Sequence, residues 1–104
     1  MVINIDGKSV TVTDTQVQNL KKAVRLSTGF DDEITQGIEA ALTEMSRAGV
    51  TKLDMSNSLV YKTAELYLKF VFNFQANGEN YYNHFQRLCD KLALTKSYVV
   101  ETNA

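Results

Sequence analysis

His84 and Cys89 are the residues from which a thiol nucleophile and its general base could be built. Activation of a thiol requires the imidazole within hydrogen-bond reach of the sulfur. A separation of five residues along a helix rotates two side chains about 140° apart, so these two diverge. Cys89 also falls in the apolar stripe of its predicted helix, where a buried thiol is inert. We therefore predict no catalysis by this pair.

The run Asp31, Asp32 and Glu33 could supply oxygen ligands to a metal ion. Adjacent helical residues point about 100° apart, so the three carboxylates do not converge on one ion. No histidine is near them in the sequence. Negative charges at a helix N-terminus are favourable by themselves, which is the interpretation we adopt.

The stretch from Lys69 to Gln86 is unusually aromatic. It holds six of the ten rings of the chain: Phe70, Phe72, Phe74, Tyr81, Tyr82 and Phe85. Stacking on single-stranded nucleic acid requires exposed rings beside Lys or Arg. The later rings lie on the apolar stripe of their predicted helix, with Arg87 on the opposite side. Packing in the core or against another subunit is the better explanation, because each ring buries a large area.

Composition narrows the classes of function. The 104 residues carry a net charge of −1, without the basic surplus that sequence-tolerant nucleic-acid binders usually show. A single cysteine excludes an internal disulfide and is typical of a reducing compartment. Asp6 and Lys8 interrupt the short apolar start, so we expect no signal peptide, and no apolar run is long enough to span a membrane. "IDGKS" lacks the spacing of a phosphate loop. We expect no enzyme, cofactor or metal site.

A β-hairpin is predicted at residues 2–12, turning at Asp6-Gly7, a favoured two-residue turn. Apolar residues alternate on one of its faces: Met1, Ile3, Ile5, Val10 and Val12. A hairpin of this size is not stable alone, so that face must pack against the rest of the fold.

Four helices are predicted to follow, over about residues 15–26, 31–48, 57–75 and 79–92. Their expected end signals are Thr13 or Asp14 at the start of the first, Gly29 at its end, Gly49 after the second, and Ser56 before the third. The second and fourth helices have the cleanest apolar stripes, so we expect Ile38 and Leu88 to be buried.

The third helix has a wider apolar arc than the others, extended on one flank by Leu66, Phe70 and Phe74. A helix apolar over about two-thirds of its circumference is central to the fold or covered by a partner. Phe70, Phe72 and Phe74 also alternate as in a strand, but the helical phase of the preceding residues favours a helix.

The last residues, 94–104, have no helical period and no cap. We predict an extended tail whose apolar cluster is Tyr98, Val99 and Val100. The predicted fold is therefore mainly α: a small four-helix bundle with an N-terminal hairpin over residues 1–93, followed by the tail.

Three segments together resemble the small head-tail connector, or adaptor, proteins of tailed double-stranded DNA bacteriophages. They are "DDEITQGIEAALTEMSRAGV" (31–50), "LVYKTAELYLKFVF" (59–72) and "YYNHFQRLCDKLALTKSY" (81–98). In that family an acidic start leads into a helix ending in Ala-Gly-Val, a helix of the form "A..LYVK..F" follows, and an aromatic helix closes with "L.LS..Y". The similarity spans about two-thirds of the chain.

The resemblance implies a structural virion protein located at the head-tail interface, and in the host cytoplasm during assembly. Such proteins form a homo-oligomeric ring, here expected to be a dodecamer, that extends the DNA channel below the portal protein and contacts the next connector, stopper or tail protein. DNA passes nearby without specific binding. By position, Leu94, Tyr98, Val99 and Val100 would bind the portal. The apolar surplus at Leu66, Phe70 and Phe74 would form the subunit interface.

Two alternatives stay open. A small helical DNA-binding regulator could use residues 15–48 as a helix-turn-helix, although the second helix exposes Glu39 and Glu44 where phosphates would have to bind. A phage tail-assembly chaperone or other accessory protein is the second alternative. It would be absent from finished particles, whereas a connector would be present.

Overall fold

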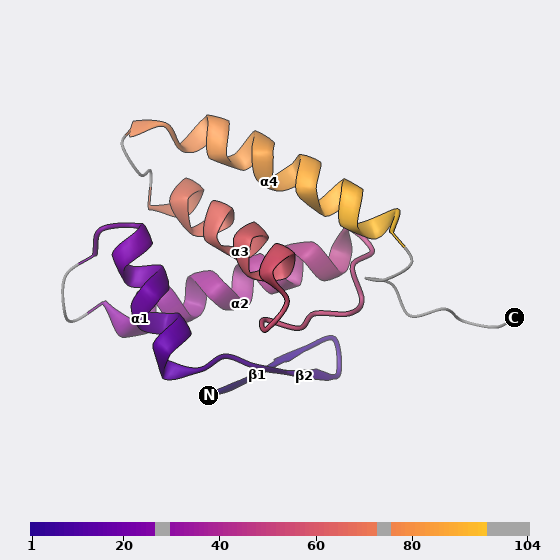
Figure 1. The fold of residues 1–104 in the computed structure, drawn as a ribbon, viewed down its shortest axis with the longest axis horizontal. Helices are drawn as coiled ribbons and strands as arrows, with labels where there is room; N and C mark the ends of the chain where they lie inside the picture. The colour runs from indigo at the N-terminus through magenta and orange to yellow at the C-terminus, as the bar shows by residue number, and fades with distance from the viewer. Residues whose placement is uncertain (27–29, 73–75, 96–104) are drawn as a thin grey trace, which may run out of the picture.

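The computed structural model describes residues 1–26, 30–72 and 76–95. Over these ranges the chain forms a hairpin and then four helices (Figure 1). The elements are β1 (Val2–Ile5), β2 (Lys8–Thr11), α1 (Asp14–Ala23), α2 (Asp31–Arg47), α3 (Ser58–Val71) and α4 (Gly78–Ala93). The predicted fold class, mainly α with an N-terminal hairpin, is confirmed. The predictions for Gly29, Phe74 and the tail residues Tyr98, Val99 and Val100 lie outside the described residues.

The hairpin turns at Asp6-Gly7 as predicted, with φ of 49° and 80°, the left-handed values of a type I′ turn. β1 and β2 are antiparallel, with Ile3 opposite Val10. Ile3, Ile5, Val10 and Val12 are buried, whereas Met1 is 42% exposed and lies outside the core. The turn is held to the body of the protein, because Ser46 on α2 donates a hydrogen bond to the Asp6 carboxylate and Lys8 Nζ donates to the Thr51 carbonyl.

Helix ends follow local hydrogen bonding. Thr13 begins α1 with a capping box: its hydroxyl accepts from the Gln16 N–H, and the Gln16 side chain accepts from the Thr13 N–H. The helix ends at Ala23, three residues before the predicted end. The backbone turns left-handed at Arg25 (φ 56°), and the Leu26 N–H donates to the Lys21 carbonyl. Helical bonding stops there because the chain has adopted a Schellman motif.

The prediction that Ser56 caps α3 is wrong. The N-cap is Asn57, whose Oδ1 accepts from the N–H groups of Leu59 and Val60 at 2.9 and 3.3 Å. The Ser56 hydroxyl instead donates to Asp54 Oδ1 at 2.7 Å. Both side chains are good caps, so the turn formed by Asp54 decides which one reaches the helix. At the end of α2, Gly49 adopts φ 105° and supplies the predicted C-terminal cap.

An ion pair between a buried lysine and an exposed aspartate joins α1 to the start of α2. The Lys21 side chain is only 5% exposed, and its ammonium lies 2.6 Å from Asp31 Oδ1. A lysine buried without a partner would be costly, so Asp31 stabilises this arrangement. The carboxylate also lies in the first turn of α2, where the helix dipole favours negative charge.

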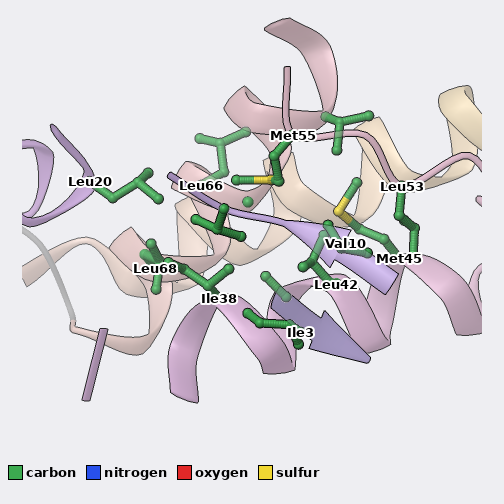
Figure 2. Close-up of a cluster of buried hydrophobic side chains, with 14 of the residues drawn as sticks. Ile3, Val10, Leu20, Ile38, Leu42, Met45, Leu53, Met55, Leu66 and Leu68 are labelled. Atoms are coloured by element: carbon green, nitrogen blue, oxygen red, sulfur yellow. The ribbon is translucent and has the colours of Figure 1, made fainter. Parts of the chain in front are cut away.

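α3 lies between α2 and α4, and α2 also contacts α1 and β1 (Figure 1). Apolar side chains from all these elements meet in one core, with Ile38, Leu42, Met45 and Leu68 completely buried (Figure 2). The expectation for Ile38 is confirmed. Leu88 is only partly buried and packs at the margin of this core.

α2 and α3 pack tightly at Gly37. A Cβ added there would lie 2.5 Å from Leu68 Cδ2, well inside van der Waals contact. Leu68 is fully buried, so its side chain has little room to move away. The absence of a side chain at Gly37 therefore permits the spacing of the two helices.

We expect Gly37→Ala to lower the free energy of unfolding by up to about 2 kcal/mol. Overpacking costs about 1–3 kcal/mol, and removing a glycine from a helix interior offsets roughly 1 kcal/mol of that cost. In a Leu68→Ala background the clash is absent, so the same change should stabilise by about 1 kcal/mol. Urea denaturation of the four proteins of this cycle measures the effect. Equal destabilisation in both backgrounds would contradict the packing explanation.

Candidate interaction surfaces

The aromatic residues of α3 and α4 pack chiefly against one another. Ring centroids of Phe70 and Tyr82 are 4.5 Å apart, and those of Tyr67 and Phe85 are 4.9 Å apart. Tyr67 also meets the edge of Phe70 at 5.7 Å. Burial raises the pKa of the Tyr67 hydroxyl above its ordinary value, with nearby Glu44 and Tyr82 adding to the shift. The rings thus join two helices of the same chain.

This packing changes the predicted subunit interface. Leu66 is 7% exposed and belongs to the monomer core, in the cluster of Figure 2, so it offers no outer surface. Phe70 is half-buried against Tyr82. Phe74 lies outside the described residues. The wide apolar arc of α3 arises largely because the helix is covered from several directions within its own chain.

Leu94 is the predicted portal-binding residue that the structure describes. It follows α4 directly, keeps helical backbone angles and is 88% exposed. The Thr95 hydroxyl donates to the Lys91 carbonyl, which helps to close the helix. The boundary predicted between residues 93 and 94 coincides with the end of α4, while the predicted roles of residues 98–100 remain predictions.

Cys89 and His84 occupy different environments. His84 is exposed, whereas Cys89 is buried beside a hollow of about 390 Å³ between α2 and α4. Burial, with a smaller contribution from the carboxylates of Asp90 and Glu44, raises the pKa of the Cys89 thiol to about 12. A thiol in this environment remains protonated at neutral pH and is a poor nucleophile.

The acidic run has the predicted position, since all three carboxylates lie in the first turn of α2. Across residues 1–26, 30–72 and 76–95, no group of three or more His, Cys, Asp or Glu side chains could hold a metal ion. Within those same segments, no helix is both long enough and apolar enough to cross a membrane.

The outer side of α2 is a surface that sequence reasoning did not single out. Along its middle lie Gln36 and two short side chains, Ala40 and Thr43, with carboxylates on its margins, and a hollow of about 360 Å³ lies over it. The lining residues are Gln36, Glu39, Ala40, Thr43 and Glu44. A second hollow, of about 350 Å³, adjoins the first and includes Tyr67, Val71 and Phe72 of the α3 end. The sequence signal that could have indicated this surface is the presence of small residues on the polar side of this amphipathic helix.

Comparisons of the chain with protein-family models, with curated proteins and with solved structures gave no match.

The environment of Cys89 predicts slow labelling. At neutral pH, a thiol-reactive disulfide reagent should modify Cys89 only when the fold opens, so the labelling rate should follow the unfolding equilibrium and rise with urea. Labelling at the rate of a small free thiol in native buffer would contradict this burial.

The raised pKa of Cys89 also predicts a pH dependence. The stabilising contribution of the neutral thiol is fully present below about pH 9, the ordinary pKa, and is lost as pH rises toward 12. The wild-type protein should therefore lose stability faster than Cys89→Ala between pH 9 and 11. Parallel stability curves for the two proteins would contradict the shift.

The reassignment of Leu66 predicts that Leu66→Glu fails to fold, because a carboxylate would enter the core without a partner. Leu59→Glu is the matched control, since Leu59 lies on the same helix and is 45% exposed. This variant should retain a helical circular dichroism spectrum and a cooperative thermal transition. Equal stability of the two variants would place Leu66 on an outer surface after all.

Proposed function

We propose that this protein is a head-tail connector, or adaptor, of a tailed double-stranded DNA bacteriophage. In this role it assembles as a ring beneath the portal protein, extends the DNA channel, and presents a surface to the next connector, stopper or tail protein. The role is structural and requires neither a catalytic site nor a cofactor.

The observation that carries the proposal is the order and spacing of three motifs, at residues 31–50, 59–72 and 81–98. Their described parts coincide with α2, α3 and α4, which pack in succession around one core. Amphipathic helices are common individually, so the support comes from the combination of order, spacing and end signals. Gly49 is one such signal, because the Ala-Gly-Val that ends the first motif forms the cap of α2.

The charge distribution favours a conduit over a DNA-binding regulator. A helix-turn-helix formed by α1 and α2 would have to present basic side chains to phosphates. The exposed side of α2 instead carries Glu33 and Glu39, with Glu44 partly exposed at its margin. Carboxylates there would repel the DNA backbone, whereas weak interaction with DNA suits a channel through which DNA must pass.

The portal contact is assigned to the chain that follows α4. Tyr98, Val99 and Val100 form an apolar, strand-prone cluster after the last described helix. A segment of this kind can add to the sheet edge of a partner or lie in a groove on it. One subunit would bind weakly, and a ring of subunits would bind strongly through effective concentration.

Two measurements test the proposal. Mass spectrometry should detect the protein in purified virions of the phage that encodes it, since a connector remains in the particle and a tail-assembly chaperone does not. The protein should also co-sediment with portal-bearing, DNA-filled heads. Absence from virions together with failure to bind such heads would refute the connector role.

We expect deletion of residues 96–104 to leave the free energy of unfolding nearly unchanged, because Thr95 and its bond to α4 are retained. Co-sedimentation with heads should be lost. The control is the full-length chain with Tyr98→Ser, Val99→Ser and Val100→Ser, which keeps the length and removes the apolar side chains. Undiminished binding by both variants would move the portal contact to the helical body.

A further inference from the structure

The outer side of α2 has the form of a docking site for a helix. Gln36, Ala40 and Thr43 follow one another at spacings of four and three residues along this side. Ala40 has almost no side chain, and the Thr43 hydroxyl is turned toward its own helix, where it donates to the Glu39 carbonyl. At these two positions the surface is therefore shallow, which allows close approach by another helix.

Carboxylates border this shallow strip. Glu39 is exposed, and Glu44 makes only a 3.4 Å contact with the exposed Arg47. Ion pairs so exposed contribute little, so Glu44 can change partner at small cost. Glu33 adds a further charge near the start of the strip. Arg47 at the far end is the one cation on this side of α2, leaving its first three turns acidic.

An apolar hollow adjoins the strip on the side of α3. It is lined by Val71, which is 46% exposed, together with Tyr67 and Phe72. On α2 its lining runs from Glu33 to Ala40. A partner that covers the whole surface would need positive charges to face the carboxylates and one apolar side chain at its end to fill the hollow.

The outer side of α4 has these complementary properties. Arg87, Lys91 and Leu94 are separated by four and three residues, so they lie along one side of the helix, and all three are exposed. Asp90 flanks this row but lies toward the hollow shared with α2. Leu94, at 88%, is the most exposed large apolar residue in the part of the chain described.

We propose that the outer side of α2 receives α4 of a second copy of this chain, running antiparallel, with Leu94 in the apolar hollow and Lys91 and Arg87 beside Glu39 and Glu44. The spacings agree. Arg87 lies seven residues before Leu94, about 10.5 Å along α4. On α2, Gly37 lies at the level of the hollow, and Glu44 lies seven residues after it. Lys91 then lies at the level of Ala40, next to Glu39.

The donor and acceptor surfaces belong to different helices, so the contact is heterologous and repeats from copy to copy. It rests on the proposed function in that it supplies the contact between neighbours in the ring. It also assigns Leu94 to the subunit interface and leaves the portal contact to residues 96–104. A pair of three-turn helix faces is smaller than a stable dimer interface, which buries about 1,200 Å² or more, so free copies should associate weakly.

Disulfide trapping tests the geometry. Gln36→Cys protein mixed with Leu94→Cys protein should form a heterodimer on mild oxidation, because Gln36 lines the hollow next to Gly37. Gln36→Cys mixed with Gln18→Cys, at an exposed position of α1, should not. The native Cys89 is buried and should not compete. A chain with both Gln36→Cys and Leu94→Cys should give a ladder of products longer than dimers. A trapping yield no higher than in the Gln18 control, or dimers alone, would overturn the proposal.

Charge exchange tests the chemistry. Lys91→Glu should weaken self-association about tenfold in sedimentation velocity, because it places like charges together. Lys22→Glu is the matched control, since both lysines are exposed in the last turn of a helix, and it should have no effect. The double variant Glu39→Lys with Lys91→Glu should recover association. Equal losses in both lysine variants, or no recovery in the double variant, would overturn the assignment.

The same variants separate this contact from the proposed function. If wild-type protein forms rings on DNA-filled heads and neither trapping nor charge exchange affects them, the connector role stands and the α2–α4 contact is wrong. If the protein neither binds heads nor occurs in virions, yet the ladder and the charge recovery are found, the self-association stands without the connector role.

Discussion

The close approach of α2 and α3 at Gly37 is the constraint on which the rest of the arrangement depends. With no Cβ at that position, Leu68 lies directly against the α2 backbone, and the two helices share one apolar layer. Ile38 and Leu42, on the turn that follows, are then completely buried. Helices separated by even one additional methyl group would open voids along this layer, and protein cores tolerate such voids poorly. Because α2 is fixed in this way, the hairpin, α1 and α3 all pack against a single central helix.

The position of α3 follows from that constraint and explains its composition. One side of α3 meets α2, and another is covered by α4 through the ring contacts of Tyr67, Phe70, Tyr82 and Phe85. A helix enclosed by two others requires an apolar arc wider than that of a surface helix. The surplus of aromatic residues is therefore largely accounted for within one subunit. The surfaces left for partners are more polar, and charge complementarity becomes the property that distinguishes them.

Periodicity and end signals predicted the helices and the hairpin because those features depend on neighbours in the sequence. The Asp6-Gly7 turn, the Thr13 cap and the Gly49 cap are all local. The errors have a different origin. Ser56 and Asn57 are both suitable caps, and only the bond from Ser56 to Asp54 decides between them. Leu66 is more buried and Leu88 less buried than expected, because burial at the edge of a stripe depends on how helices cross. The role of Gly37 and the shallow side of α2 likewise require the three-dimensional packing.

In the proposed connector, an assembly built on polar helix faces would have a physical advantage, because its subunits would have to join the ring at one place and time. Strong apolar self-association would let free subunits assemble before reaching their platform, and open-ended heterologous contacts would then form filaments. A contact made of two exposed ion pairs and one leucine is weak for isolated copies and sensitive to salt. Binding of each subunit to a shared platform raises the effective concentration of its neighbours, so the same contact becomes sufficient there. The acidic side of α2 and the basic row of α4 would in this way restrict assembly to the platform without any change of fold.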